Sequence, residues 1–352
     1  MTTPRDDETS LEGFIRAIPK VELHVHLGGT IQPETLLMLA KRNSVELPAD
    51  TIEGIRDWYG FRDFNHFIEV YMTVSRCLCT ADDVELITRE FLRGQAEQNV
   101  RYTEITYGGF RLATERGVPF GEQLAAINRA NDWARTELGV SLGIIAEIGR
   151  LLEPEQGLQV AGWAVEGMQQ GVIALGLGGA EADHPPAKFR KAFARAREAG
   201  LPAVPHAGEV VGAEGIWDAL RETNPARIEH GVRCLEDPAL VSELRDRQIP
   251  LDVCPGSNVA LGVVPSIEEH PLPRLIEAGL HVTLNSDDPP MFDTTLTDEY
   301  LTCARTFGWD ADSVQRIAID GARASLLPPV QKAALVSESE TSIAALREQF
   351  EV

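Results

Sequence analysis

Residues 23–30, LHVHLGGT, place two histidines on either side of one valine and follow them with two glycines. Residues two positions apart in a β-strand point to the same face, so His24 and His26 are predicted to face one interior. Imidazole nitrogen is a good zinc ligand, and such a pair fills one side of an ion. The pair alone is weak evidence for a metal, because the chain contains 8 histidines. Its meaning depends on which residues end the other strands.

The apolar run at 21–27, which contains these histidines, is the first of eight short runs with polar residues or glycine at or near their ends. The others lie at 101–108, 141–148, 172–179, 203–209, 227–231, 250–258 and 281–288. Helical patterns separate most of them, and those at 186–200 and 266–280 end at a glycine, as helices often do. Strands alternating with helices predict a parallel sheet, and eight strands can close into a (β/α)₈ TIM barrel. An open doubly wound sheet is the alternative, since short apolar runs do not distinguish the two.

Length and composition are those of one large α/β domain. The chain has 352 residues, 43% of them apolar, and no low-complexity linker, so we expect a flexible tail at 1–10 and one barrel domain at 11–352. No apolar run is long enough to span a membrane, and the first residues do not form a secretory signal. The 5 cysteines include no C-x-x-C pair, which favours a reduced chain in the cytoplasm.

The formal net charge of −22 is strongly negative. Such a surface repels phosphate backbones, so nucleic acid is not expected as substrate or partner. The charge is otherwise explained by solubility. The charge therefore argues against nucleic acid as a partner and does not identify the partner or substrate.

An insertion is predicted at about 50–95, after the first strand, because its aromatic and aliphatic residues recur at helical spacing. In a barrel, this position lies at the mouth where active sites are built. These helices are either additional core or a lid over the pocket. The patterns at 310–326 and 342–350 predict helices that close the barrel.

Polar residues that suit a metal centre recur at the ends of the predicted strands. His206 ends the fifth run, and the paired carboxylates Asp287 and Asp288 end the eighth. Together with His24 and His26, they offer three histidines and a carboxylate, a set that leaves a catalytic zinc ion one position for water. Binuclear barrel hydrolases use a bridging lysine at the end of the fourth strand. The run at 172–179 has none, which indicates one metal ion.

Two further residues suit hydrolysis. Glu209 follows His206 by three positions and is placed to exchange a proton with a substrate, and His230 ends the sixth run, where it could orient or deprotonate a water. Zinc lowers the pKa of a bound water from 15.7 to about 7, so the set predicts a metal-dependent hydrolase. The remaining histidines are predicted to be structural or exposed: His66, His184, His270 and His281.

Five motifs in this order resemble the adenosine deaminase family of the amidohydrolase superfamily, over about residues 19–300. They are KVELHVHLGGTIQPETL (20–36), HAGE (206–209), EHG (229–231), CPGSN (254–258) and LNSDDPPMF (284–292). No single motif is specific, but the combination is. The H-x-E and P-C-x-x-C signature of cytidine-type deaminases is missing. The resemblance implies hydrolytic deamination of a 6-aminopurine at C6, with release of ammonia.

The resemblance also implies a role for each matching residue. One zinc ion would be bound by His24, His26, His206 and Asp287. Glu209 would give a proton to purine N1 while water, held and activated by His230, attacks C6. Asp288 would hydrogen-bond to N7, for which it must carry a proton, and the backbone N–H of Gly179 would meet N3.

The chain departs from the family at Gly28, where many members have an aspartate that contacts the ribose 5′-hydroxyl. Gly176 replaces a second family aspartate. The missing acceptor and the space that glycine leaves favour a nucleoside enlarged at its 5′ carbon. We expect 6-amino-6-deoxyfutalosine, an intermediate of menaquinone biosynthesis, ahead of adenosine, and both ahead of adenine. Its aryl carboxylate could pair with Arg62 or Arg150.

Three alternatives remain. Another residue could reach the 5′-hydroxyl of adenosine in place of the aspartate missing at Gly28. The chain could be a non-catalytic purine-binding barrel, although binding alone does not need a proton donor such as Glu209. It could also be another mononuclear amidohydrolase that acts on a ring amide, against which the positions of Gly179 and Asp288 argue. Phosphorylated substrates are disfavoured, because no cluster of lysine or arginine follows the first or eighth run.

Overall fold

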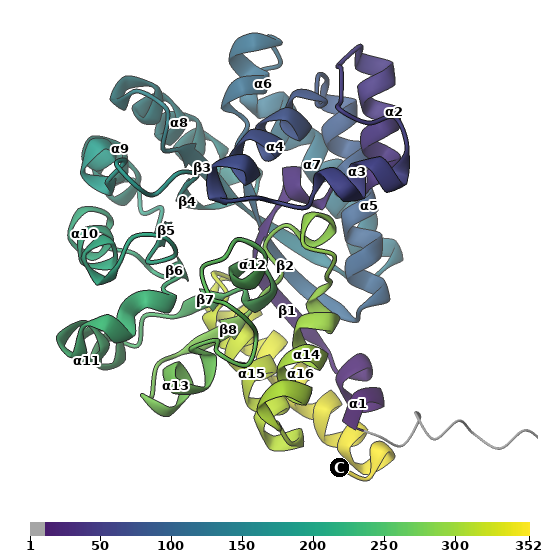
Figure 1. The fold of residues 1–352 in the computed structure, drawn as a ribbon, viewed down its shortest axis with the longest axis vertical. Helices are drawn as coiled ribbons and strands as arrows, with labels where there is room; N and C mark the ends of the chain where they lie inside the picture. The colour runs from purple at the N-terminus through teal and green to yellow at the C-terminus, as the bar shows by residue number, and fades with distance from the viewer. Residues whose placement is uncertain (1–10) are drawn as a thin grey trace, which may run out of the picture.

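The computed structural model describes residues 11–352, so the prediction for the tail at 1–10 lies outside the described residues. Eight strands form one sheet in chain order, and each neighbouring pair is parallel. They are β1 (Lys20–His26), β2 (Val100–Tyr107), β3 (Ser141–Gly149), β4 (Val172–Gly178), β5 (Ala203–Ala207), β6 (Ile228–His230), β7 (Leu251–Val253) and β8 (Val282–Leu284). Helices surround this sheet (Figure 1), which confirms the predicted TIM barrel.

The helices follow the strands in the expected alternation. After α1 (Leu11–Ala17) and β1 come α2 (Pro33–Asn43), α3 (Ile52–Trp58), α4 (Phe64–Arg76) and α5 (Ala81–Glu97). The middle of the chain supplies α6 (Phe110–Glu115), α7 (Phe120–Glu137), α8 (Pro154–Glu166), α9 (Arg190–Glu198), α10 (Ala213–Thr223) and α11 (Pro238–Arg247). The last are α12 (Pro255–Ala260), α13 (Leu272–Glu277), α14 (Leu296–Phe307), α15 (Ala311–Ala324) and α16 (Pro329–Phe350).

The barrel closes where the end of β8 meets β1. The backbone N–H of His26 donates to the carbonyl of Asp287 at 3.0 Å, and the N–H of Asp287 donates to the carbonyl of His24 at 3.1 Å. The side chain of Asn285 accepts from the N–H of Leu23 at 2.7 Å, so the contact between the two segments continues along β1 toward its N-terminal end. Closure therefore brings the two histidines of β1 beside the carboxylates that follow β8, although more than 250 residues separate them in the chain.

A buried charge cluster supports the barrel below this level. Arg227, at the start of the sixth strand, forms 2.7 Å ion pairs with Glu104 on β2 and Asp252 on β7. All three side chains are buried, so each charge needs the others as partners. The cluster links the β6 segment to β2 and β7 below the histidines and carboxylates at the mouth.

Two predicted boundaries are wrong, and proline explains both. The run at 250–258 is a strand only through Val253, and α12 then starts at Pro255, because proline cannot donate to a sheet but suits the first turn of a helix. The helix predicted at 266–280 is reduced to α13, which starts after Pro271. The first correction matters for function, because it turns the CPGSN motif into a turn and a helix at the barrel mouth.

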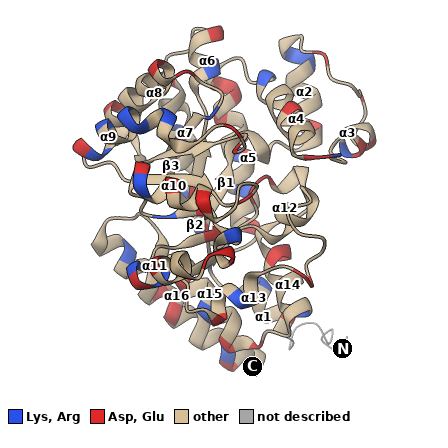
Figure 2. Ribbon diagram, turned by 60° about the vertical axis from the view of Figure 1, so that its left-hand side comes forward, with Lys and Arg blue, Asp and Glu red and all other residues tan. Residues whose placement is uncertain are grey.

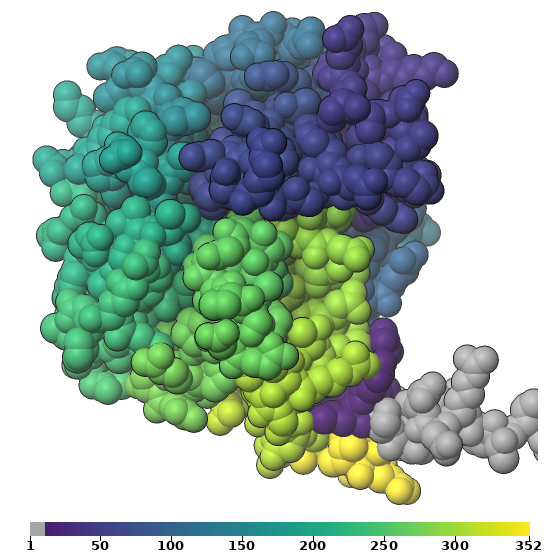
Figure 3. Space-filling model, viewed as in Figure 1, coloured from purple at the N-terminus to yellow at the C-terminus, as the bar shows by residue number. Residues whose placement is uncertain are grey.

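The predicted insertion is present as α3, α4 and α5. Its helices begin at side-chain caps: Asp63 accepts from the N–H of His66 at 2.8 Å, and Thr80 accepts from that of Asp83 at 3.1 Å. The ring of Phe67 on α4 lies 5.6 Å from that of Phe292 after β8. Figure 3 shows the insertion beside the segments that follow β7 and β8. Helix α4 is thus both core and cover, since it buries Val70 and Val74 and lies over the mouth.

The outer surface carries both charges. Figure 2 shows acidic and basic residues interspersed along the helices. None of the helices in residues 11–352 combines the length and apolar character needed to cross a bilayer.

Candidate metal centre and active site

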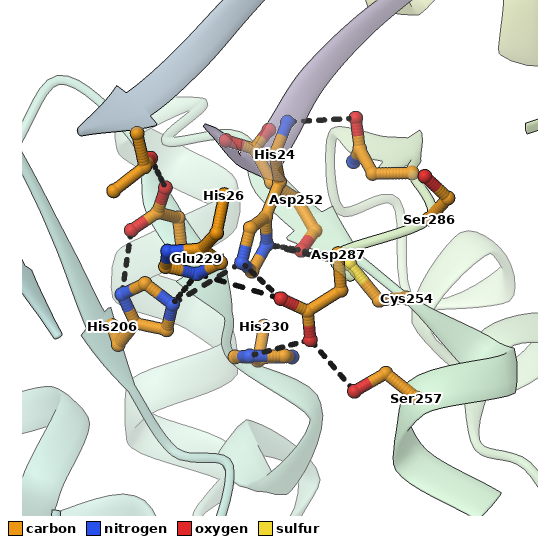
Figure 4. A network of polar contacts seen from close by, with 12 residues as sticks. His24, His26, His206, Glu229, His230, Asp252, Cys254, Ser257, Ser286 and Asp287 are labelled. Atoms are coloured by element: carbon orange, nitrogen blue, oxygen red, sulfur yellow. Dashed lines mark hydrogen bonds and ion pairs between the residues drawn. The ribbon is translucent and has the colours of Figure 1, made fainter. Parts of the chain in front are cut away.

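The four predicted ligands meet at the mouth of the barrel (Figure 4). His206 Nε2 lies 3.2 Å from His24 Nε2 and 3.1 Å from His26 Nε2. Asp287 Oδ1 lies 3.5 Å from His24 Nε2 and 3.4 Å from His26 Nε2. Atoms bound 2.0–2.2 Å from one zinc ion lie about 3.0–3.5 Å from their neighbours in the coordination shell. The spacing of these four atoms therefore fits a shared ion.

The hydrogen bonds on the other side of the rings leave the Nε2 atoms available to a cation. His24 Nδ1 lies 3.1 Å from the carbonyl of Asp252, and His206 Nδ1 lies 3.0 Å from the carbonyl of Leu177. A carbonyl only accepts, so each Nδ1 carries a proton, and in the neutral ring each Nε2 presents a lone pair. Two lone pairs 3.2 Å apart beside a carboxylate repel one another unless a cation lies between them. The site is fit for a metal ion.

Outer carboxylates and hydroxyls orient these ligands. Glu229 Oε2 lies 2.7 Å from His206 Nδ1, and its other oxygen accepts from Thr106 at 3.0 Å. Asp287 Oδ2 accepts from the hydroxyl of Ser257 at 2.7 Å, which leaves Oδ1 toward the histidines. Such partners fix the ring orientation of a metal-binding histidine. Sequence reasoning missed Glu229 and Ser257 as functional, although both lie inside the quoted motifs EHG and CPGSN.

Two of the site residues have a backbone conformation that side chains rarely adopt. His230 has φ 66° and Asp287 has φ 67°, both in the left-handed region. Such conformations persist when the surrounding structure imposes them, and they concentrate at functional sites. His230 is the last residue of β6, and Asp287 follows the end of β8 by three positions.

Glu209 and His230, the predicted proton-handling pair, lie close together. Glu209 Oε1 is 3.6 Å from His230 Nε2, which is 3.9 Å from Asp287 Oδ2. Burial, and then the charge of Asp287, raises the pKa of Glu209 to about 8, so its carboxyl holds a proton at neutral pH. Burial, and then His24, lowers the pKa of His230 well below its usual value, so the imidazole is neutral.

A chain of hydrogen bonds fixes the tautomer of His230. The N–H of Leu272 donates to His270 Nδ1 at 3.0 Å, so the proton of His270 is on Nε2 and is donated to Asn258 Oδ1 at 3.1 Å. That contact orients the Asn258 amide, whose nitrogen lies 3.4 Å from His230 Nδ1 and can only donate. The neutral His230 ring therefore carries its proton on Nε2, facing the site. His270, predicted to be structural or exposed, is buried and supports this chain.

Asp288 is completely buried beside Asp287. Burial, and then the neighbouring carboxylate, raises the pKa of Asp288 well above its usual value, so it is protonated at neutral pH. Its Oδ1 has no hydrogen-bond partner among the described residues. A buried polar atom without a partner is unfavourable, which is consistent with a ligand that supplies one. The geometry accords with the predicted donor to a purine nitrogen, a role that remains a prediction.

A cavity of about 180 Å³ lies in front of this cluster. One wall consists of Gly178, Gly179 and the acidic and imidazole groups described above, and the other is apolar: Phe64, Phe67, Ile68, Tyr71 and Met72 of α4, with Leu151 and Leu152 after β3. Gly179, which directly follows β4, has φ 92°. Glycine is the residue that adopts this conformation readily, so it exposes backbone where a side chain would be strained. A groove of about 580 Å³ adjoins the cavity at Phe64 and Glu209.

The expectation that Gly28 opens space in the pocket is wrong. A β-carbon at this position would lie 3.0 Å from the hydroxyl oxygen of Tyr71 and 3.5 Å from that of Ser75, both on α4. The insertion therefore fills the space that the glycine leaves. Sequence reasoning missed Tyr71 because its contact with Gly28 exists only once α4 packs over the mouth.

The two arginines suggested as carboxylate partners are not free in the pocket. Arg62 is exposed before α4 and does not line the cavity. Arg150 lines the cavity, but it donates at 2.6 Å to the carbonyls of His184 and His206. These bonds hold the strand that carries His206, so the two guanidinium nitrogens that make them are not free to bind a substrate carboxylate.

Comparison with known proteins agrees with this geometry. Residues 19–342 match the family model "Adenosine deaminase". The chain is 40% identical over 97% of its length to aminodeoxyfutalosine deaminase of Streptomyces coelicolor, covering 88% of that protein. It is 38% identical over 91% of its length to an adenine deaminase of Chlorobium phaeobacteroides, covering 95% of that protein. The crystal structure of adenine deaminase from Arthrobacter aurescens superposes with a TM-score of 0.88 at 35% identity, covering 93% of this chain and all of that one.

Proposed function

The chain belongs to the adenosine deaminase family and is a metal-dependent hydrolytic deaminase, and from this premise we propose that it removes the amino group at C6 of a 6-aminopurine in a site for one zinc ion. The observation that carries this proposal is the convergence of three imidazole Nε2 atoms and one carboxylate oxygen at 3.1–3.5 Å. The ion would be bound by His24, His26, His206 and Asp287. Three nitrogens and one oxygen are ligands that zinc prefers.

In the reaction the oxygen of a water bonds to C6, one of its protons ends on N1 and the other on the amino group, and the C6–N bond breaks to release ammonia and leave a 6-oxopurine. The four ligands would hold a zinc ion, which would supply a water activated for attack at neutral pH. Glu209 holds the proton for N1, because its raised pKa keeps the carboxyl protonated. His230 Nε2–H, 3.9 Å from Asp287 Oδ2, orients the attacking water by donating a hydrogen bond.

The purine is oriented by groups on both sides of the barrel. Protonated Asp288 donates to N7, and the backbone N–H of Gly179 donates to N3. The buried, unpartnered Oδ1 of Asp288 supports the first contact, and the backbone exposed at Gly179 supports the second. In this pose C6 points to the metal ligands and N1 points to Glu209.

For the substrate we propose 6-amino-6-deoxyfutalosine, the nucleoside expected from the sequence. Gly28 offers no acceptor for a free 5′-hydroxyl, and the mouth is lined by exposed apolar side chains, Met72 and Leu151, that suit an aryl group. The relatives named aminodeoxyfutalosine deaminase, at 40% and 39% identity, support the same substrate.

Free adenine is the second candidate, and one observation favours it. Tyr71 and Ser75 fill the space beside Gly28, and the cavity of about 180 Å³, taken without the adjoining groove, is small for an elaborated nucleoside. Relatives named adenine deaminase at 38–39% identity agree with it. This observation moves adenine ahead of adenosine, for which the site shows no 5′-hydroxyl acceptor at Gly28.

A substrate panel tests the proposal. It compares kcat/KM of the zinc-loaded protein for 6-amino-6-deoxyfutalosine, adenine, adenosine and a 5′-thio-substituted adenosine, with ammonia release as the readout. A preference for the first substrate supports the nucleoside proposal, and a preference for adenine supports the second candidate. A wide preference for adenosine contradicts both, while absence of turnover with every 6-aminopurine contradicts the deaminase site itself.

A further inference from the structure

Glu147, near the end of β3, is a buried acid in the cavity wall that the proposed reaction does not use. Its exposed fraction is 9%, and its Oε1 has no hydrogen-bond partner among residues 11–352. A β-carbon on Gly178 would lie 1.9 Å from this oxygen, so only glycine at that position accommodates the carboxyl. A buried carboxylate oxygen without a donor is unfavourable, and such an atom in a ligand cavity calls for a partner.

Glu147 borders the metal ligands but is not among the four converging atoms, and it lies with His26 and His206 in a group whose possible ligand atoms are within 4.8 Å of one another. Its Oε1 lies 3.8 Å from His26 Nδ1, whereas the Nε2 of the same ring faces His206 and Asp287. The nearest ring nitrogen of His26 to the carboxyl is therefore Nδ1, and not the Nε2 that faces the other ligands. The distance of 3.8 Å also exceeds that of a hydrogen bond, so His26 does not satisfy Glu147.

The order of strands around the barrel indicates which part of a purine Glu147 faces. In the proposed pose, N1 meets Glu209 after β5, N3 meets Gly179 after β4, and N7 meets Asp288 after β8. Along the purine edge away from C6, the nitrogens follow in the order N1, N3, N9 and N7. In the sheet, β4 lies between β5 and β3. The strand that comes after β5 and β4 in this direction is therefore β3. The N9 side of the ring is thus directed toward β3.

From this placement we propose that Glu147 is a substrate-binding residue that accepts a hydrogen bond from a donor on the N9 side of the purine. The donor is the N9–H of a free base, or the 2′-hydroxyl beside the glycosidic bond of a nucleoside. Both present one N–H or O–H to the same carboxylate. The inference rests on the proposed function, because the orientation of the purine is taken from it.

The test compares substrates that differ only in this donor. One pair is adenine and 9-methyladenine, and the other is the preferred nucleoside and its 2′-deoxy form. Each is assayed for kcat and KM with the zinc-loaded parent, Glu147→Gln and Glu147→Ala, while zinc content and melting temperature are measured in parallel. Glu155→Gln, an exposed acid on the neighbouring helix α8, is the matched control.

We expect the parent to prefer the donor-bearing member of one pair by about 10-fold or more, since a site that bonds a polar group rejects the analogue that lacks it. Glu147→Ala should lose that preference, mainly through KM, and retain zinc. Glu147→Gln, which keeps the shape of the side chain, should weaken the preference if the alanine variant does not fold. The substrate pair whose preference changes in the variants shows whether the donor belongs to a free base or to a nucleoside.

An undiminished preference in Glu147→Ala would overturn the inference. So would loss of zinc with unchanged KM, because Glu147 would then act as support for His26. A parent that deaminates no 6-aminopurine would instead contradict the proposed function, so the two failures are distinguishable.

Discussion

The β-carbon that Gly29 lacks would lie 1.6 Å from Asp288 Oδ1, although the two residues come from opposite ends of the chain. The second glycine of LHVHLGGT is therefore required by the buried carboxyl that follows β8. This contact depends on barrel closure, which places the end of β8 against β1. The glycine and the carboxyl form one structural unit in the cavity wall.

Gly29→Ala should strongly impair the enzyme, because the new methyl group must displace Asp288. We expect kcat/KM to fall by at least about 100-fold, as misplacement of a substrate-positioning group can do. Steady-state kinetics and zinc content check this result. The matched control is Gly28→Ala, whose β-carbon comes no closer than 3.0 Å to its nearest neighbour, the Tyr71 hydroxyl, and should have the milder effect. Equal effects of the two substitutions would show that the contact with Asp288 is unimportant.

Gly28→Asp should change the substrate preference only when a second substitution makes room for the new carboxylate. Because Tyr71 and Ser75 occupy the space, the single variant should lose activity toward every substrate. Gly28→Asp combined with Tyr71→Phe should recover turnover and shift kcat/KM toward adenosine, whose 5′-hydroxyl the new carboxylate can accept. Tyr71→Phe alone is the control. A shift toward adenosine in the single variant, without loss of activity, would contradict the role given to Tyr71.

The pH profile should report Glu209. Its pKa of about 8 is raised by burial first, so the protonated form that gives a proton to N1 is present below pH 8 and is lost as the pH rises through it. We expect kcat/KM to fall above about this pH. Glu209→Gln should retain zinc, show no such decline and turn over on the order of 10² to 10⁴ times more slowly. Turnover within a few-fold of the parent would exclude Glu209 as the proton donor.

The hydrogen-bond chain behind His230 predicts an effect at a distance. His270→Phe removes the donor that orients Asn258, so the tautomer of His230 is no longer fixed. We expect kcat to fall about 10-fold or more with zinc content nearly unchanged, as for other partners that orient active-site groups. His270→Gln keeps an N–H donor and should recover part of the loss. If both substitutions lower kcat to the same extent, the hydrogen bonds from His270 to His230 have only a structural role.

The sequence was sufficient to predict the barrel and the meeting of the four proposed ligands at its mouth. Eight apolar runs with polar ends determine where side chains such as His24 and Asp287 lie, because the ends of parallel strands meet at one face. The resemblance to the family adds roles for residues in matching motifs. The conformational limits of proline account for the two wrong boundaries.

What could not be predicted depends on contacts between distant segments. Tyr71 on α4 lies beside Gly28 only after the insertion folds over the mouth. Glu147 looks like an ordinary residue of β3 until the structure shows that its carboxyl faces a cavity without a donor. Three-dimensional packing, and not a local pattern, defines both of these residues.

The central claim, one zinc ion bound by His24, His26, His206 and Asp287, is tested most directly by metal analysis of the purified chain and its variants. The account predicts about one zinc per chain, with both metal and deaminase activity lost in His24→Ala and in Asp287→Ala. His281→Ala, whose ring contacts the carbonyl of Asp320 away from the site, should retain both. Two metal ions per chain, or full activity after chelation has removed the zinc, would contradict the account.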